Sequence, residues 1–206
     1  MALWAIVPVK PLRRGKSRLA PVLSDDDRAE LNQKLLTRTI DTLKQMPELV
    51  DVLVVSRDPE ALSLARDHGA RTLREDGAPQ LNVALTRATV VAKSYNAEGV
   101  LILPADLPQV SKEDVAAMLA AGSEAPSVVI APDHHRSGTN ALFVNPAGLI
   151  EYDFGEGSFH SHSEKAKAAG ARLVVLELQS LAHDVDVPED LSFLGTSPLL
   201  NAEAES

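Results

Sequence analysis

The chain has 206 residues and a formal net charge of −9, with 45% hydrophobic residues, 3% aromatic residues and no cysteine. The lack of cysteine excludes disulfides, thiolate nucleophiles and cysteine-bound zinc, and it fits a cytoplasmic protein. The acidic balance argues against a protein that holds nucleic acid through its overall charge, but it leaves room for a local basic pocket that binds small phosphorylated ligands. The length suits one domain over residues 1–206.

The pattern of apolar residues, caps and glycines predicts strands that alternate with helices, with Ser24 and Ser111 as helix N-caps. In chain order we expect strand 2–9, helix 23–45, strand 51–56, helix 58–69, strand 70–75, helix 80–96, strand 99–104, helix 111–122, strands 127–132 and 139–145, helix 158–170, strand 171–179 and a frayed tail over 196–206. Such alternation indicates an α/β fold with a mostly parallel sheet and helices on both faces. Ligands of these folds bind at the carboxyl ends of the strands.

The N-terminal stretch MALWAIVPVK has no basic segment before its apolar residues. It therefore predicts a first strand and not a signal peptide. No apolar run approaches the roughly 20 residues that span a bilayer, so we expect no membrane segment.

The first strand is followed by a strongly basic loop, WAIVPVKPLRRGKSRLAPVLS. Its cationic residues around Gly15 are Arg13, Arg14, Lys16 and Arg18. The GKS inside it is not a Walker A loop, because position 10 is lysine where that motif needs glycine, and Pro21 interrupts the helix that should follow. Two interpretations remain: a loop that holds a triphosphate, or a solvated basic loop.

Carboxylates follow two of the predicted strands. Asp106 lies in PADLP just after strand 99–104, and Asp184 and Asp186 lie in AHDVDVPEDL. Residues two apart in an extended segment point the same way, so both later aspartates can face one site. Mg²⁺ is typically held by one or two carboxylates plus substrate phosphates. The alternatives are that Asp106 forms a turn and that Asp186 caps a helix beginning at Pro188.

Two loops combine glycine with a hydroxyl. Thr139 follows Gly138 just before a strand, and Ser158 follows Gly155 and Gly157 just before a helix. Backbone N–H groups and a hydroxyl at a helix N-terminus form a seat for an anion, although glycine and serine there are also ordinary helix caps.

Together these motifs resemble the CofC/FbiD family of guanylyltransferases, which act in biosynthesis of the deazaflavin coenzyme F-420. The matching stretches span residues 6–191 in the family's order and are VPVKPLRRGKSRL, PADLP, GTNALF, FGEGSFHSH and DVDVPEDL. The resemblance implies a Rossmann-like nucleotidyltransferase fold of the nucleotide-diphospho-sugar transferase type. It implies transfer of GMP from GTP to the phosphate of a three-carbon acid, either phosphoenolpyruvate or 2-phospho-L-lactate; a phosphoglycerate acceptor also stays open.

The resemblance also assigns roles to individual residues. The Mg²⁺ ligands, for two ions, would be Asp106, Asp184 and Asp186. The acid's carboxylate would be held by Thr139, Gly155 and Ser158. The GTP phosphates would be held by Lys10, Lys16 and Arg18, with Lys16 and Asp106 acting in catalysis.

Two rival functions remain from the sequence. One is a related nucleotidyl- or glycosyltransferase that uses another nucleotide or acceptor, and the other is a non-catalytic module that binds a nucleotide. The expected partners are GTP and the phospho-acid, a downstream transferase of the F-420 pathway, and no nucleic acid or membrane. The oligomeric state is open, with a homodimer as one alternative.

Overall fold

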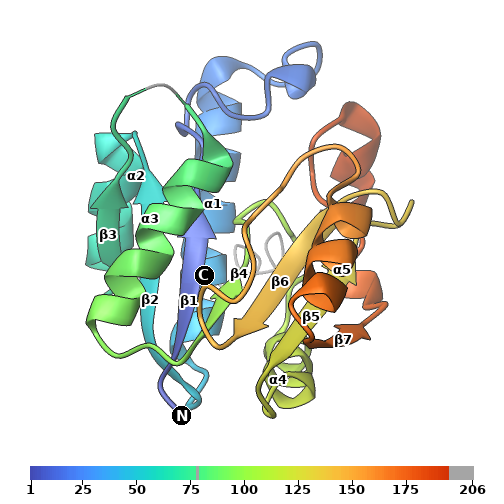
Figure 1. Ribbon diagram of the computed structural model, residues 1–206. Coiled ribbons are helices and arrows are strands. Elements are labelled where there is room, and N and C mark those ends of the chain that lie inside the picture. Colours follow the sequence, from blue (N-terminus) through green and yellow to red (C-terminus); the bar gives the residue numbers. More distant parts are fainter. Residues whose placement is uncertain (78, 195–206) are drawn as a thin grey trace.

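The predicted alternation of strands and helices is present in the computed structural model, which describes residues 1–77 and 79–194 (Figure 1). The elements are β1 (Leu3–Pro8), α1 (Asp25–Lys44), β2 (Leu49–Ser56), α2 (Pro59–Asp67), β3 (Arg71–Arg74), α3 (Leu81–Ser94), β4 (Gly99–Ile102), α4 (Lys112–Ala121), β5 (Ser127–Pro132), β6 (Thr139–Asn145), α5 (Ser158–Ala168) and β7 (Arg172–Val175). The predicted tail over 196–206 lies outside the described residues.

Three 3₁₀ helices join these elements, and of these only a helix beginning at Pro188 was considered from the sequence. They are η1 (Ser17–Leu19), η2 (Gln179–Leu181) and η3 (Pro188–Phe193). The last strand, β7, ends at Val175 with its pairing to β5, and is therefore shorter than the predicted range 171–179. Short 3₁₀ turns lack the long apolar periodicity that marks an α-helix in a sequence.

The strands form one seven-stranded sheet in the order β3-β2-β1-β4-β6-β5-β7. The pairs β1–β2, β1–β4, β2–β3 and β5–β7 are parallel, whereas β6 runs antiparallel to β4 and β5. The prediction of a mostly parallel sheet is confirmed. Only residues 133–138 join β5 to β6, and a connection that short makes a hairpin because a parallel crossover needs a dozen or more residues.

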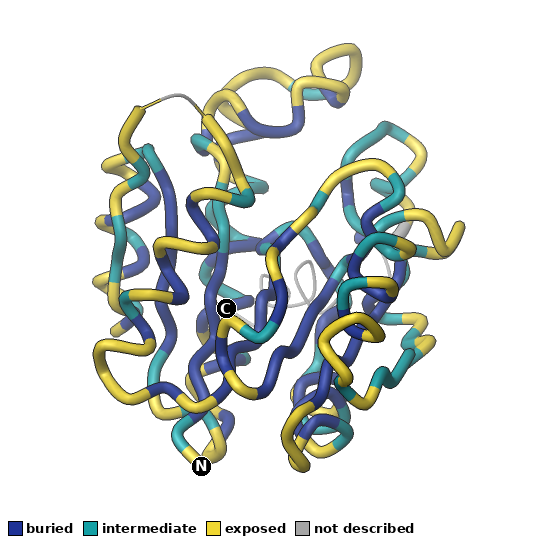
Figure 2. Tube along the Cα trace, viewed as in Figure 1, coloured by how far each residue is buried: buried dark blue, intermediate teal, exposed yellow. Residues whose placement is uncertain are grey.

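The core has two halves, one on each face of the sheet. Along β1, Ala5 and Val7 belong to the cluster that packs against α1, α2 and α4, whereas Trp4 and Ile6 belong to the cluster under α3 and α5. Figure 2 shows the inner strands as mainly buried and the outward helix faces as exposed. Helices therefore cover both faces, as predicted, and the β1 side chains from Leu3 to Val7 are divided between the two halves of the core.

Local capping fixes where the helices begin. At α1 the Ser24 hydroxyl accepts from the Asp27 N–H, and the Asp27 carboxylate accepts from the Ser24 N–H. The same reciprocal pair joins Ser111 and Asp114 at α4. Both serines were predicted as N-caps, and the reciprocal carboxylate bonds complete each cap. No helix in the described part of the chain is long and apolar enough to cross a bilayer.

Candidate active site

A pocket of about 520 Å³ opens at the edge of the sheet where β1 and β4 end and β6 begins. It is lined by the loop after β1, the turn after β4, the first residues of β6, the start of α5 and the segment around residue 185. Carboxyl ends of parallel strands meet at this edge, which is where the fold class places ligands. Of the predicted site residues, the structure brings eight to this pocket: Lys10, Lys16, Asp106, Thr139, Gly155, Ser158, Asp184 and Asp186.

The basic loop after β1 is held from two helices. The Asn32 side-chain amide of α1 donates to the Leu12 carbonyl oxygen at 2.6 Å, and the Asp58 carboxylate accepts from the Leu12 N–H at 2.8 Å. Gly15 is packed so closely that a Cβ there would lie 2.9 Å from the Asn32 amide nitrogen. The loop therefore has a fixed path, and no sequence pattern indicated that a polar residue in the middle of a helix would anchor it.

The cations of this loop do not share one environment. Arg13 forms an ion pair with Asp26 at 2.7 Å, and Arg18 forms one with Asp186 at 2.9 Å, with the Arg18 side chain 72% exposed. Lys16 is only 7% exposed. Lys16 has a left-handed backbone with φ of 55° and is followed by the turn η1, not by an α-helix, so the Walker A interpretation is excluded here.

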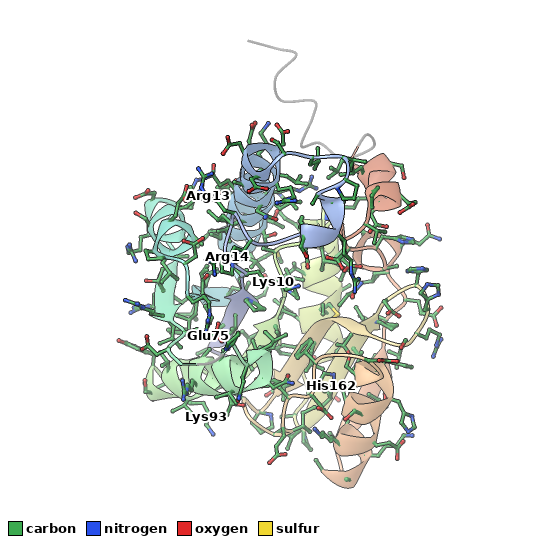
Figure 3. The ribbon with its side chains drawn as sticks, turned by 90° about the horizontal axis from the view of Figure 1, so that it is seen from above. Lys10, Arg13, Arg14, Glu75, Lys93 and His162 are labelled. Atoms are coloured by element: carbon green, nitrogen blue, oxygen red, sulfur yellow. The ribbon has the colours of Figure 1, made fainter. Side chains whose placement is uncertain are left out.

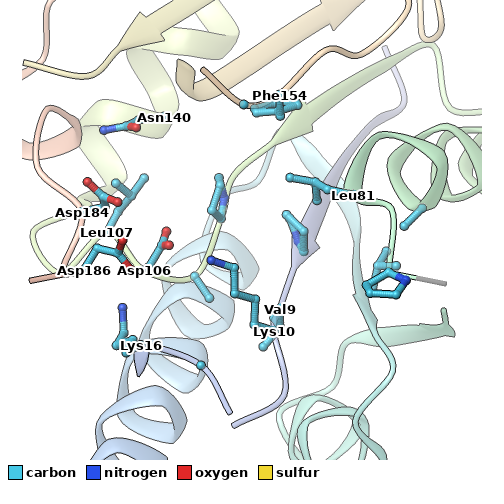
Figure 4. A pocket seen from close by; sticks show the side chains of 18 of the residues that line it. Val9, Lys10, Lys16, Leu81, Asp106, Leu107, Asn140, Phe154, Asp184 and Asp186 are labelled. Atoms are coloured by element: carbon cyan, nitrogen blue, oxygen red, sulfur yellow. The ribbon is translucent and has the colours of Figure 1, made fainter. Parts of the chain in front are cut away.

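The Lys16 ammonium group points toward the aspartates and donates to the Val185 main-chain carbonyl oxygen (Figure 4). Burial lowers the pKa of Lys16, while the charges of Asp106, Asp186 and Asp184 act in the opposite direction. The carboxylates therefore offset part of the effect of burial on this ammonium group.

The three predicted aspartates gather at one end of the pocket, near Lys16 (Figure 4). The Val185 N–H donates to the Asp106 carbonyl oxygen at 3.0 Å, which ties the two segments together. Val185 itself is fully buried in a small cluster with Leu19 and Leu194. Its two neighbours therefore face away from that cluster and into the pocket, as expected for an extended segment.

The pKa of Asp184 reflects its burial among these carboxylates. Burial raises its pKa, and the nearby charge of Asp106 raises it further. Within the described residues, no set of three histidine, aspartate or glutamate side chains is already arranged to hold a metal ion alone. The aspartates supply the hard oxygen ligands that Mg²⁺ prefers, and a partly open set suits an ion whose other ligands come from phosphates and water.

Asp186 is not the cap of the helix at Pro188, so that alternative is wrong. The Asp190 carboxylate accepts from the N–H groups of both Asp186 and Val187, each at 2.8 Å, and so caps η3. The Asp186 carboxylate is instead paired with Arg18.

The opposite wall of the pocket carries the hydroxyl pair. Ser158 begins α5, but its hydroxyl makes no capping bond in that helix; it accepts from the Thr139 N–H at 2.9 Å. Ordinary capping therefore does not explain this serine. Further lining residues that sequence reasoning missed are Asn32, Arg57, Glu75, Gln80, Leu81, Asn140 and Phe154.

A sheet of this topology, with a cationic loop and carboxylates at its ligand-binding edge, defines the nucleotidyltransferase class. Two solved structures share the fold. One, from Desulfovibrio desulfuricans G20, is provisionally named a nucleotide-diphospho-sugar transferase and aligns with a TM-score of 0.77 at 17% identity, over 100% of this chain and 92% of that one. The other is a nucleotidyl transferase from Methanothermobacter thermautotrophicus, with a TM-score of 0.69 at 17% identity, over 97% and 98%.

Within that class, the chain belongs to the family described as guanylyl transferase CofC like, whose model matches residues 3–195. A protein of Rubrobacter xylanophilus named phosphoenolpyruvate guanylyltransferase is 45% identical, over 96% of this chain and 95% of its own. A protein of Methanothermobacter thermautotrophicus named 2-phospho-L-lactate guanylyltransferase is 36% identical, over 93% and 83%. The resemblance seen in the sequence motifs is confirmed.

Proposed function

We propose that the protein transfers GMP from GTP to the phosphate of phosphoenolpyruvate and releases pyrophosphate. The observation that carries the proposal is one pocket in which Lys16 lies among Asp106, Asp184 and Asp186, with the Thr139 and Ser158 hydroxyls on the other wall. Family membership supports the reaction class. The name of the relative at 45% identity supports phosphoenolpyruvate over 2-phospho-L-lactate and phosphoglycerate.

The chemistry needs no protein nucleophile and no general base. A phosphate monoester is mostly a dianion at neutral pH, because its second pKa is about 6. Its oxygen attacks the α-phosphorus of GTP, a new P–O–P bond forms, and the bond to the pyrophosphate leaving group breaks. The barrier is dominated by electrostatic repulsion, since two anions must approach each other in line.

The side chains of this pocket would lower that barrier by position and charge. Lys16, with Lys10 close by, would hold the GTP phosphates, and Arg18 would assist from outside the pocket wall. Asp106, Asp184 and Asp186 would hold the magnesium ions, two in number. Magnesium, when bound, would neutralise phosphate charge and stabilise the leaving group. Thr139, Gly155 and Ser158 would hold the acid's carboxylate.

The proposal places the protein in the cytoplasm, in coenzyme F-420 biosynthesis. A reactive diphosphate product implies a downstream transferase that consumes it, and a homodimer is the simplest assembly to test for.

The test is a pyrophosphate-release assay with Mg²⁺ that crosses GTP, ATP, CTP and UTP with phosphoenolpyruvate, 2-phospho-L-lactate and 3-phosphoglycerate. We expect release with GTP and phosphoenolpyruvate, and a product with the mass of the guanosine diphosphate ester. Release with a different nucleotide or acid would identify a related transferase. Nucleotide binding without release in any combination would identify a binding module.

A further inference from the structure

His162 lies directly behind the hydroxyl wall and does not line the pocket itself. It is in the middle of α5, where Figure 3 labels it, and it is fully buried. Its ring Nδ1 lies 3.0 Å from the Thr139 hydroxyl oxygen, and its ring Nε2 lies 2.9 Å from the Asp153 main-chain nitrogen. The edge of the ring also packs against Phe154, with centroids 4.9 Å apart.

These two contacts fix where the ring carries its proton. A backbone N–H can only donate, so Nε2 must accept from Asp153 and carries no hydrogen. Burial, together with the charge of Lys165, lowers the pKa of His162 to about 4, and the charge of Asp153 opposes this only in part. The ring is therefore neutral at pH 7, its one hydrogen is on Nδ1, and Nδ1–H donates to the Thr139 hydroxyl oxygen.

The direction of the hydrogen bond from His162 to Thr139 decides which further bond the Thr139 hydroxyl can make. The Thr139 hydroxyl oxygen already accepts from His162, so its own hydrogen is left to donate. Ser158 is in the same state, because its hydroxyl oxygen accepts from the Thr139 N–H. In the described part of the chain neither hydroxyl hydrogen has an acceptor. Both residues line the pocket, so the wall presents two O–H donors to whatever binds there.

We propose that His162 is a positioning residue that holds the Thr139 hydroxyl as a hydrogen-bond donor to the carboxylate of the acid substrate. This inference rests on the proposed function, because it needs an acid with a carboxylate at this wall. A carboxylate accepts hydrogen bonds and cannot donate, so it matches a wall whose hydroxyls are committed to donating. A ligand group that can only donate, such as an ammonium group, would leave these two hydroxyl hydrogens without an acceptor.

Two substitutions at position 162 separate the two ring contacts. His162→Gln can still offer a carbonyl oxygen near the Nε2 position to the Asp153 N–H, but it removes the donor to Thr139. His162→Asn can keep an amide donor near the Nδ1 position, but it loses the contact with Asp153. We expect His162→Gln to raise the KM for phosphoenolpyruvate about tenfold with the KM for GTP unchanged, and His162→Asn to raise it much less. A tenfold change corresponds to about 1.4 kcal/mol, which is close to the lower end of the range for a hydrogen bond to a charged group.

Changes at Thr139 complete the test as a double-mutant cycle. Thr139→Val keeps the shape and removes the hydroxyl, so it should raise the KM for phosphoenolpyruvate at least as much as His162→Gln. Combining the two changes should add nothing further, because both act through one hydroxyl. His160→Gln, at an exposed histidine of the same helix, is the matched control and should retain the wild-type KM. Additive effects of the two changes would show that His162 only supports the loop. Equal rises in the KM values of both substrates, for His162→Gln and His162→Asn alike, would show the same.

The tautomer can be read on the unmodified protein, which keeps the inference testable even where a variant fails to fold. Nitrogen NMR of protein labelled with ¹⁵N in histidine should show His162 neutral and protonated on Nδ1 at pH 7. A hydrogen on Nε2, or a charged ring, would overturn the inference. A wild-type protein that released no pyrophosphate would overturn the proposed function instead, so the two failures are distinguishable.

Discussion

The Lys16 ammonium group donates a hydrogen bond to the main-chain carbonyl oxygen of Val185, the residue between Asp184 and Asp186. This single bond joins parts of the chain that are 169 positions apart. It sets the cation of the opening loop beside the carboxylates of the last described segment. The first two predictions below, on Asp106 and Lys16, follow from this arrangement of charges.

Replacing Asp106 with asparagine should abolish GMP transfer while the fold persists. The change keeps the side-chain shape but removes a negative charge that Lys16 and Asp184 both experience. We expect kcat to fall by a factor of about 100 or more, as for the loss of an electrostatic group in a pre-organised site. Pyrophosphate release at saturating Mg²⁺ and a thermal melt are the measurements. Asp67→Asn, on the exposed end of α2, is the matched control; full activity of the Asp106 variant would remove this residue from the mechanism.

Lys16 and Arg18 should differ strongly in their effect on GTP use. Lys16 is buried among the carboxylates, whereas the Arg18 side chain is 72% exposed, and a charge in contact with solvent is screened. We expect Lys16→Met to lower kcat/KM for GTP by a factor of about 100 or more, and Arg18→Met by less than about tenfold. Steady-state kinetics with varied GTP decide the order. A larger loss for the Arg18 variant would mean that the triphosphate lies outside the pocket.

Asn32 should matter through the path of the basic loop. Asn32→Leu has a similar size but leaves the Leu12 carbonyl oxygen without its 2.6 Å donor. Losing the partner of a half-buried acceptor costs about 1–2 kcal/mol of unfolding free energy. We expect that loss in urea unfolding together with a higher KM for GTP. Gln33 is the neighbour of Asn32 on α1, and Gln33→Ala, which removes an exposed bond to Glu60 of α2, serves as the control. An unchanged KM would show that GTP binding does not depend on this anchor.

The stability of the protein should decrease between about pH 6.5 and pH 4 through His162. Its pKa is about 4 in the folded protein, against about 6.5 in an unfolded chain. In that interval the unfolded state binds the proton that the folded state excludes, so the contribution is complete above pH 6.5 and is lost as the pH falls. The loss is roughly 3 kcal/mol at most. Urea unfolding across this pH range should show that the free energy of unfolding depends less steeply on pH in His162→Gln than in the wild type. Equal slopes for both proteins would contradict the assignment.

The sequence by itself determined the elements of this fold. The serines at positions 24 and 111, each before an acidic first turn, placed two helix starts correctly. Apolar runs of strand length placed the strands. These signals are readable because they arise from interactions between residues that are near each other along the chain. The motifs GTNALF and FGEGSFHSH also carried the family resemblance that the comparisons confirm.

Only the tertiary structure decided how those elements are arranged and which of their side chains contact each other. It turned β6 antiparallel, placed Asn32 under the basic loop, separated Arg18 from the buried Lys16, and set His162 against Thr139. Each of these contacts or separations involves residues that are distant in sequence. Each depends on which segments pack together in the folded chain. A one-dimensional pattern records that a residue is polar. The hydrogen-bond partner of that residue is fixed only when the sheet brings the segments to one edge. The partner in turn determines the charge state of the residue and whether it donates or accepts.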